Sequence, residues 1–461
     1  MQFSFDKYII DTREENAFKS KTFSNYKKGD VTKELTNCLM ANQYEQCHYW
    51  CAELVCSGHF EELWDTIISY TGKHINMGNP KIPIYLNMRV DAFRDVARKN
   101  RDSDIALRNN SKIRKLFAEV IGVILTSKNR LCAHRVKVCS NSDNFDLMNM
   151  SSKLRAPDVT YVKEFFKEDD PKELYIPVNE MGYHLSDSSK DAVEACYWIE
   201  WMLEYETQTN KRKDKCVCSK RVNEMVNEKY QTDLIWLIWD VILHYGANCV
   251  STINKQRSVP PITKSKIIRA LYNLFTLRYN CRIKSRRIQL LYFAVNIITS
   301  SFIDNTEIIE NKNLIHSYTD NADLIYKELK KNEMVEDGKE EVADNICQKI
   351  MMKQEKENST THSSSASCSM HKMDILNRGY DLGHSKSSHD VVSSTKKKGK
   401  GTIPEDMSSM EKSIMKMNIL DNVAISSLSI PTAKSASKIE EVRIHDIGTH
   451  KAIQLKTDVP K

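Results

Sequence analysis

The C-terminal part of this sequence contains almost no aromatic residues. Of the 13 Phe, 6 Trp and 19 Tyr residues, only Tyr380 lies beyond residue 330. A packed core needs bulky apolar side chains, because their burial must offset the conformational entropy that the backbone loses on folding. We therefore predict a folded body that ends near residue 330 and a mostly disordered tail over residues 331–461.

Glycine, proline and long apolar runs are scarce as well. The 13 Gly and 10 Pro residues argue against an all-β fold, which needs many turns, and favour helices. The strongest apolar run, residues 234–243, is interrupted by Asp240 and is too short to span a membrane. Residues 1–18 mix charged and apolar side chains and lack the apolar centre of a secretory signal. We therefore expect a protein of the cytosolic compartment.

Cysteine, by contrast, is plentiful, with 13 residues in the chain. Cytosolic thiols are kept reduced, and a folded body of about 300 residues needs no disulfides for stability. We expect free thiols. The net charge of +7 is mild, so it is compatible with an anionic partner without requiring one.

Apolar residues recur at three- and four-residue steps along much of the chain, which predicts an all-α body of about eight or nine helices. Gly58 and Gly72 are candidates to end helices, and Ser111 is a candidate N-cap. The large residues expected to anchor the core are Trp50, Trp64, Phe117, Trp198, Trp236 and Trp239. The predicted helices cover residues 42–55, 60–68, 86–96, 111–124, 189–207, 234–243, 264–280, 286–301 and 320–330.

A long polar connection over residues 127–157 indicates a domain junction. The predicted divisions are an irregular segment 1–30, a first helical subdomain 31–157, a second helical subdomain 158–330, and the tail 331–461.

Cysteine and histidine are concentrated in one short stretch: Cys47, His48, Cys51, Cys56 and His59. Zinc prefers four thiolate or imidazole ligands, and Cys47, Cys51, Cys56 and His59 are the candidates here. The alternative is a set of buried thiols, because Cys47 and Cys51 also fall on the apolar face of the predicted helix, where free Cys packs as a small hydrophobe. We predict no cofactor, with zinc as the alternative.

Catalytic motifs are not found. Cys51 or Cys196 could be a nucleophile with His48, His59 or His184 as its base, but neighbours on one helix rarely supply that geometry. No phosphate-binding glycine loop, metalloprotease motif or nucleophile elbow occurs in the sequence. We therefore predict that the protein is not an enzyme.

Two basic segments are candidates for binding nucleic acid, because clustered cations gain affinity for phosphate by releasing counterions. The alternative is that they are solvated links between apolar helices. The candidate residues are Lys211, Arg212, Lys213, Lys215, Arg282, Lys284, Arg286 and Arg287.

The tail contains three further features. Residues 359–369 are rich in Ser, and residues 396–400 contain four Lys residues. The apolar residues Ile439, Val442, Ile444 and Ile447 could add a strand to the exposed edge of a partner's sheet.

Five blocks of the sequence resemble a conserved, uncharacterised protein family of nucleocytoplasmic large DNA viruses, including mimivirus-like and algal giant viruses. The resemblance covers roughly residues 30–300 and provides no catalytic residues. It implies a viral protein made in the host cytoplasm that acts in the virus factory or in the virion. The blocks are CHYWCAELVCSGHFEELWD (47–65), KHINMGNPKIPIYL (73–86), RNNSKIRKLFAEVIGVIL (108–125), ACYWIEWMLEYET (195–207) and QTDLIWLIWDVIL (231–243).

The function expected from these observations is a non-enzymatic interaction or scaffold protein of a large DNA virus, associated with the virion or its assembly and binding other viral proteins. The alternative is a nucleic-acid-binding accessory factor in viral replication or transcription.

Overall fold

The structure is a computed structural model that describes residues 8–99, 104–128, 150–221, 225–248, 261–301 and 307–335, except residue 310, together with residues 138 and 352. All of these residues belong to one compact unit, Met1–Ser385.

The described part of the chain is all-α, as predicted, and contains no β-strand. Helices α2, α3, α4, α6, α9, α10, α11, α13 and α15 cover predicted stretches, with ends shifted by a few residues. The helices are α1 (Lys28–Met40), α2 (Tyr44–Cys56), α3 (Phe60–Tyr70), α4 (Ile82–Lys99), α5 (Asp104–Arg108), α6 (Ser111–Thr126), α8 (Tyr175–Leu185), α9 (Ala192–Lys211), α10 (Ile235–Ala247), α11 (Pro261–Thr276), α12 (Cys281–Arg286), α13 (Ile288–Thr299), α14 (Lys312–Asp320) and α15 (Ala322–Lys330).

The helix ends follow capping chemistry. Gly58 takes the left-handed conformation expected of it, with φ 74°, after the end of α2. The N-cap of α6 is Asn110 and not the predicted Ser111, because the Asn110 side chain accepts a hydrogen bond from the Lys112 backbone N–H at 2.9 Å. Gly72 does not end a helix. It lies in a π-helical turn (Thr71–Ile75), where an added Cβ would lie 2.9 Å from Leu290 of α13.

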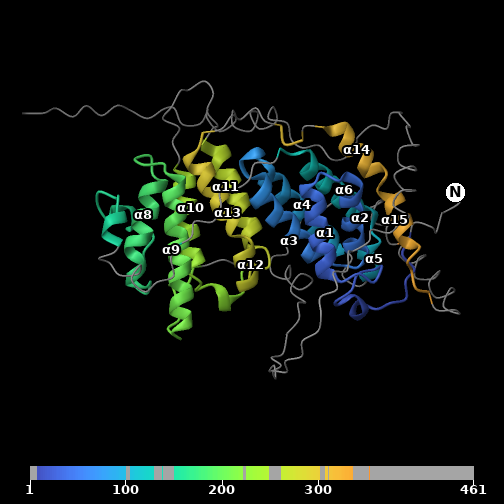
Figure 1. Cartoon of the computed structure of the whole chain (residues 1–461), viewed down its shortest axis with the longest axis horizontal. Coiled ribbons are helices and arrows are strands. Elements are labelled where there is room, and N and C mark those ends of the chain that lie inside the picture. Colours follow the sequence, from blue (N-terminus) through green and yellow to red (C-terminus); the bar gives the residue numbers. More distant parts are fainter. Residues whose placement is uncertain are drawn as a thin grey trace, which may run out of the picture. The chain divides into compact units, whose positions relative to one another are not determined.

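Helices α11 and α13 hold the two halves of the unit together (Figure 1). α11 packs against α4 on one side and α10 on the other, and α13 packs against both the Thr71–Ile75 turn and α9. The last two helices return to the beginning of the chain, since α14 packs on α6 and α15 on α2. The division at residue 157 stays a prediction, but residues 312–330 pack against helices that precede it.

The large side chains that the sequence predicted as anchors lie in the core. Trp50, Trp64, Phe117, Trp198, Trp236 and Trp239 are all buried, which confirms the six expected anchors. One group joins α3, α4 and α6, where Trp64 lies 5.1 Å from Phe117 between ring centroids. A second joins α10 to α11, where Trp239 lies 5.3 Å from Phe275. The bulky rings thus lie where helices from distant parts of the sequence meet.

The N-terminal segment binds the end of the described body. The Ile10 backbone N–H donates to the Glu333 carboxylate at 2.9 Å, and the Thr12 hydroxyl donates to the Met334 carbonyl at 3.0 Å. Residues 331–335, which the sequence assigns to the tail, are therefore attached to the body. The serine-rich stretch 359–369, the basic residues 396–400 and the apolar group Ile439, Val442, Ile444 and Ile447 lie outside the described residues.

No helix in the described part of the chain combines the length and the apolar character that a membrane crossing requires.

Candidate functional site

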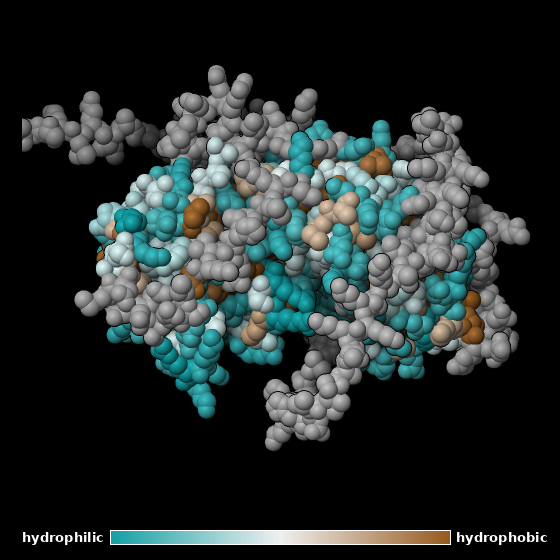
Figure 2. All heavy atoms as spheres, viewed as in Figure 1, coloured by the Kyte–Doolittle hydropathy of each residue, from teal (hydrophilic) through white to brown (hydrophobic). Residues whose placement is uncertain are grey.

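The two basic segments found in the sequence differ sharply in the structure. The first, Lys211–Lys215, begins at the last residue of α9 and is exposed at all four cations, none of which makes an ion pair with a described residue. Figure 2 shows a hydrophilic surface over this end of α9. The backbone explains why α9 ends within this segment. Lys213 takes a left-handed conformation with φ 65°, and the Asp214 N–H donates a hydrogen bond to the Thr209 carbonyl. The negative end of the helix dipole also stabilises cations at this position.

The second basic segment is neutralised by carboxylates from elsewhere in the chain. The Lys284 ammonium lies 2.6 Å from Glu206 and 2.5 Å from Asp233. Burial by itself lowers the pKa of Lys284, but the two carboxylates outweigh it and the net shift is upward. The positive charge of Lys284 is thus compensated inside the protein.

The next two cations of this segment share one acid. Arg286 and Arg287 both pair with Asp65 of α3, at 2.6 and 3.2 Å. Arg287 also donates to three backbone carbonyls at the end of α11. Of the four candidate cations in this second segment, only Arg282 is exposed and makes no ion pair with a described residue. The structure therefore brings Lys284, Arg286 and Arg287 together as links between helices.

The cysteine and histidine cluster lies in the core. Cys47, Cys51 and Cys56 are buried, and burial raises the pKa of each thiol well above its ordinary value. The His59 Nε2 lies 3.1 Å from the Lys21 carbonyl, and His48 stacks on Tyr318 of α14 at 4.6 Å between ring centroids.

Within the described ranges, no three His, Cys, Asp or Glu side chains are grouped so that they could hold a metal ion. Cys47, Cys51 and Cys56 lie in the core as buried thiols, and zinc binding stays a sequence-based prediction. Of the two candidate nucleophiles, Cys51 and Cys196 are both buried, on α2 and α9. The imidazole of His184, one of the three candidate bases, lies 3.0 Å from the Ser189 hydroxyl.

An open groove lies between α4 and α11. Its volume is about 360 Å³, within the range of about 300–1,000 Å³ typical of binding sites. Apolar and polar side chains alternate along it. It is lined by Ile84, Asn87 and Met88 of α4 and by Ile262, Ser265, Lys266, Arg269, Ala270 and Asn273 of α11.

Two observations distinguish this groove from an ordinary surface depression. Met88 and Ile262 are large apolar side chains that remain 39% and 57% exposed, and both line it. Lys266 and Arg269 make no ion pair with any described residue, and no acidic residue lines the groove. The site is therefore partly apolar and carries uncompensated positive charge.

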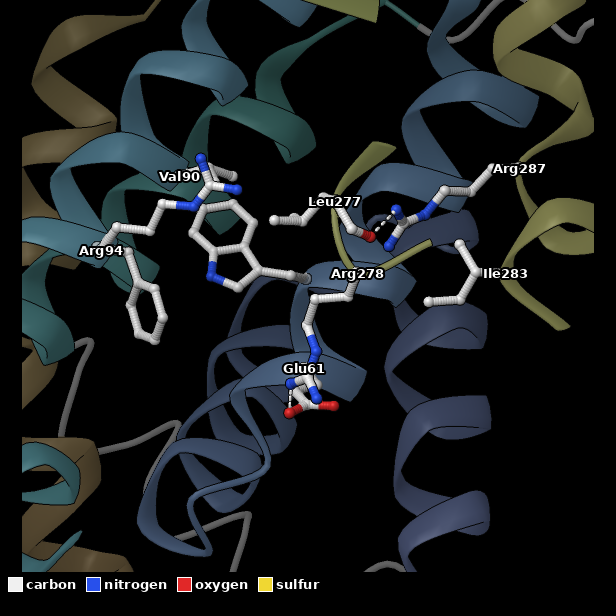
Figure 3. Close-up of a pocket in the computed structure, with 9 residues that line it drawn as sticks. Glu61, Val90, Arg94, Leu277, Arg278, Ile283 and Arg287 are labelled. Atoms are coloured by element: carbon white, nitrogen blue, oxygen red, sulfur yellow. Dashed lines mark hydrogen bonds and ion pairs between the residues drawn. The ribbon is translucent and has the colours of Figure 1, made fainter. Parts of the chain in front are cut away.

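A second, smaller hollow lies further along the same two helices (Figure 3). Its volume is about 40 Å³, and its apolar walls include Trp64, Val90 and Leu277. Arg278 reaches across it to pair with Glu61, and Arg287 is directed at the Leu277 carbonyl. Its charged groups already have partners, so we regard this hollow as a gap in the packing where α3, α4 and the end of α11 meet.

The sequence alone did not predict the groove. The signal was present on one face of α11, where Ile262, Lys266, Arg269 and Asn273 recur at three- and four-residue steps. The opposite wall comes from α4, about 180 residues earlier, and no local pattern indicates that the two helices are neighbours.

Comparison with protein-family models, curated proteins and solved structures finds no match to this chain.

Proposed function

We propose that this chain is a non-enzymatic interaction protein whose helical body docks another protein in the groove between α4 and α11. The observation that carries the proposal is the coincidence, in one groove, of exposed apolar side chains with cations that make no ion pair with a described residue. Exposed apolar surface of this kind marks interaction sites in folded proteins. The burial of Cys51 and Cys196 further favours binding over chemistry at these thiols.

The viral setting of the proposal comes from the five resembling sequence blocks. It makes the chain a scaffold or assembly protein of a large DNA virus, present in the virus factory and the virion and bound to other viral proteins.

A photocrosslinking experiment tests this function. A photoreactive p-benzoylphenylalanine replaces Met88 in the groove, and the control replaces Met40, which is 47% exposed at the end of α1. We expect mass spectrometry of gradient-purified particles to detect the chain, crosslinked to another particle protein from position 88 and not from position 40. Absence from particles, with recovery of the chain only at replicating DNA, would contradict the proposal.

The exposed segment Lys211–Lys215 supports a second candidate function, a nucleic-acid-binding accessory factor. Each phosphate contact adds about 0.9 to the slope of log affinity against log salt for duplex DNA. Replacing all four cations of the segment by Gln should therefore reduce that slope by up to about 3–4. The matched control replaces the exposed Lys112 and Lys115 of α6. No binding of random duplex DNA at low salt removes this candidate.

A further inference from the structure

The groove between α4 and α11 also indicates what kind of partner it takes. We infer that it binds an acidic amphipathic helix, which lays apolar side chains against Met88 and Ile262 and places carboxylates beside Lys266 and Arg269. This inference rests on the proposed function, since it names the partner class of the same groove.

The shape of the groove suits a helix. Residues 84–88 of α4 form one wall of the groove, and residues 262–273 of α11 form the other. The two helices pack against each other. The α11 wall, from Ile262 to Asn273, spans ~16 Å at about 1.5 Å per residue, which is about three turns of a partner helix. Two neighbouring helices form the usual type of groove for an amphipathic helix.

The charge of the groove selects an acidic partner. Lys266 and Arg269 lie one turn apart on α11, and both are exposed. Asp91, which lies one helical turn after Asn87 on α4, is 3.2 Å from Arg94 and is already paired. A carboxylate from a partner is thus favoured here, and a like-charged partner is repelled.

The remaining polar groups are available to the partner. The side-chain amides of Asn87 and Asn273 line the groove and make no hydrogen bond with a described residue. Each can both donate and accept, so they can bond polar side chains along the edge of a bound helix. The groove thus combines apolar and polar side chains, as protein interfaces in general do.

Fluorescence anisotropy with designed peptides tests the inference on the full-length protein. The probe is a 15-residue helical peptide with Leu at positions i, i+3, i+4 and i+7 and Glu elsewhere. We expect it to bind, and we expect the Lys266→Glu/Arg269→Glu variant to weaken binding at least tenfold. A Lys112→Glu/Lys115→Glu variant, with the same charge change on α6, should bind as the parent does.

Three comparisons can overturn the inference. A peptide with Lys in place of Glu should bind at least tenfold more weakly, and equal affinity contradicts the assigned charge. An Ala-for-Leu peptide with unchanged affinity contradicts the apolar contact. Duplex DNA that displaces the probe, and whose binding is lost in the Lys266→Glu/Arg269→Glu variant, assigns the groove to phosphate instead. Crosslinking from position 88 does not depend on the partner's charge, so a failed peptide experiment leaves the proposed function separately testable.

Discussion

Replacing Arg287 by Met should destabilise the protein far more than the same change at its neighbour Arg286. Arg287 is only 2% exposed, and its guanidinium pairs with Asp65. It also donates to the Leu274 and Leu277 carbonyls at 2.9 and 2.6 Å. Leu274 lies in the last turn of α11, where backbone carbonyls have no partner within the helix. One side chain therefore caps α11 and links it to α3.

The expected loss of stability follows from the buried ion pair that the Arg287→Met change breaks. Burial lowers the pKa of Arg287 to about 10, so the group is still charged at pH 7 and its removal breaks a buried ion pair. Removing one partner of such a pair typically costs about 3–5 kcal/mol. Arg286 binds the same carboxylate at 2.6 Å, but its side chain is 46% exposed. Arg286→Met should therefore cost about 1 kcal/mol or less.

Urea unfolding followed by tryptophan fluorescence measures both variants. We expect the midpoint to fall by about 1 M or more for Arg287→Met and by a small fraction of that for Arg286→Met. In 1 M salt the effect of Arg286→Met should vanish, whereas that of Arg287→Met should persist, because screening weakens exposed pairs most. Equal midpoints for the two variants would refute the reasoning.

Three other changes test the packing, the helix end and the pH dependence. Gly246→Ala should destabilise by about 1–3 kcal/mol, since the new Cβ would lie 2.5 Å from Ile268, whereas Gly29→Ala meets nothing within 4 Å and should be neutral or stabilising in thermal unfolding. Lys213→Gly should raise stability by about 1 kcal/mol because Gly tolerates the left-handed conformation, and no gain in melting temperature would contradict this account of the end of α9. Burial raises the pKa of Glu333 to about 7 in the folded protein, so its ionisation should remove stability as pH rises from about 5 to 8. Because Glu333 is partly exposed we expect about 1–2 kcal/mol, and Glu333→Gln should remove that part of the pH dependence in urea unfolding at pH 5 and pH 8.

The helices with strong apolar periodicity were predictable, and the reason why α1 and α8 were missed can be identified. In α1 only Val31, Leu35, Cys38 and Leu39 are buried, so its apolar face is narrow and polar residues dominate the stretch. Helix α8 contains Pro177 and Gly182, which normally argue against a helix. Pro177 is tolerated because it lies in the first turn.

Tertiary packing explains the glycine in α8. A Cβ at Gly182 would lie 3.0 Å from the Tyr161 carbonyl, so the close approach of another segment requires a small residue there. Gly246 in α10 has the same explanation, since Ile268 of α11 lies against it. A helix-propensity scale includes only the local cost of such residues and not the tertiary contact that offsets this cost.

The two basic segments show that the sequence also does not indicate which charges are paired. In sequence, residues 282–287 look like a free cationic patch, because the acid that pairs with Arg286 and Arg287 is Asp65, 221 positions before Arg286. The segment Lys211–Lys215 looks similar in sequence, but the structure leaves it exposed. Which cations remain available to a partner is therefore a property of the fold.

The sequence by itself determined the all-α class, the residues that anchor the core and most of the helical stretches. These follow from the spacing of apolar side chains, which is a local property that each segment carries on its own. Tertiary structure alone decided which charges are paired and where two helices leave an open groove. Those features depend on distances between segments that are far apart in the chain, and these distances exist only once the helices have packed.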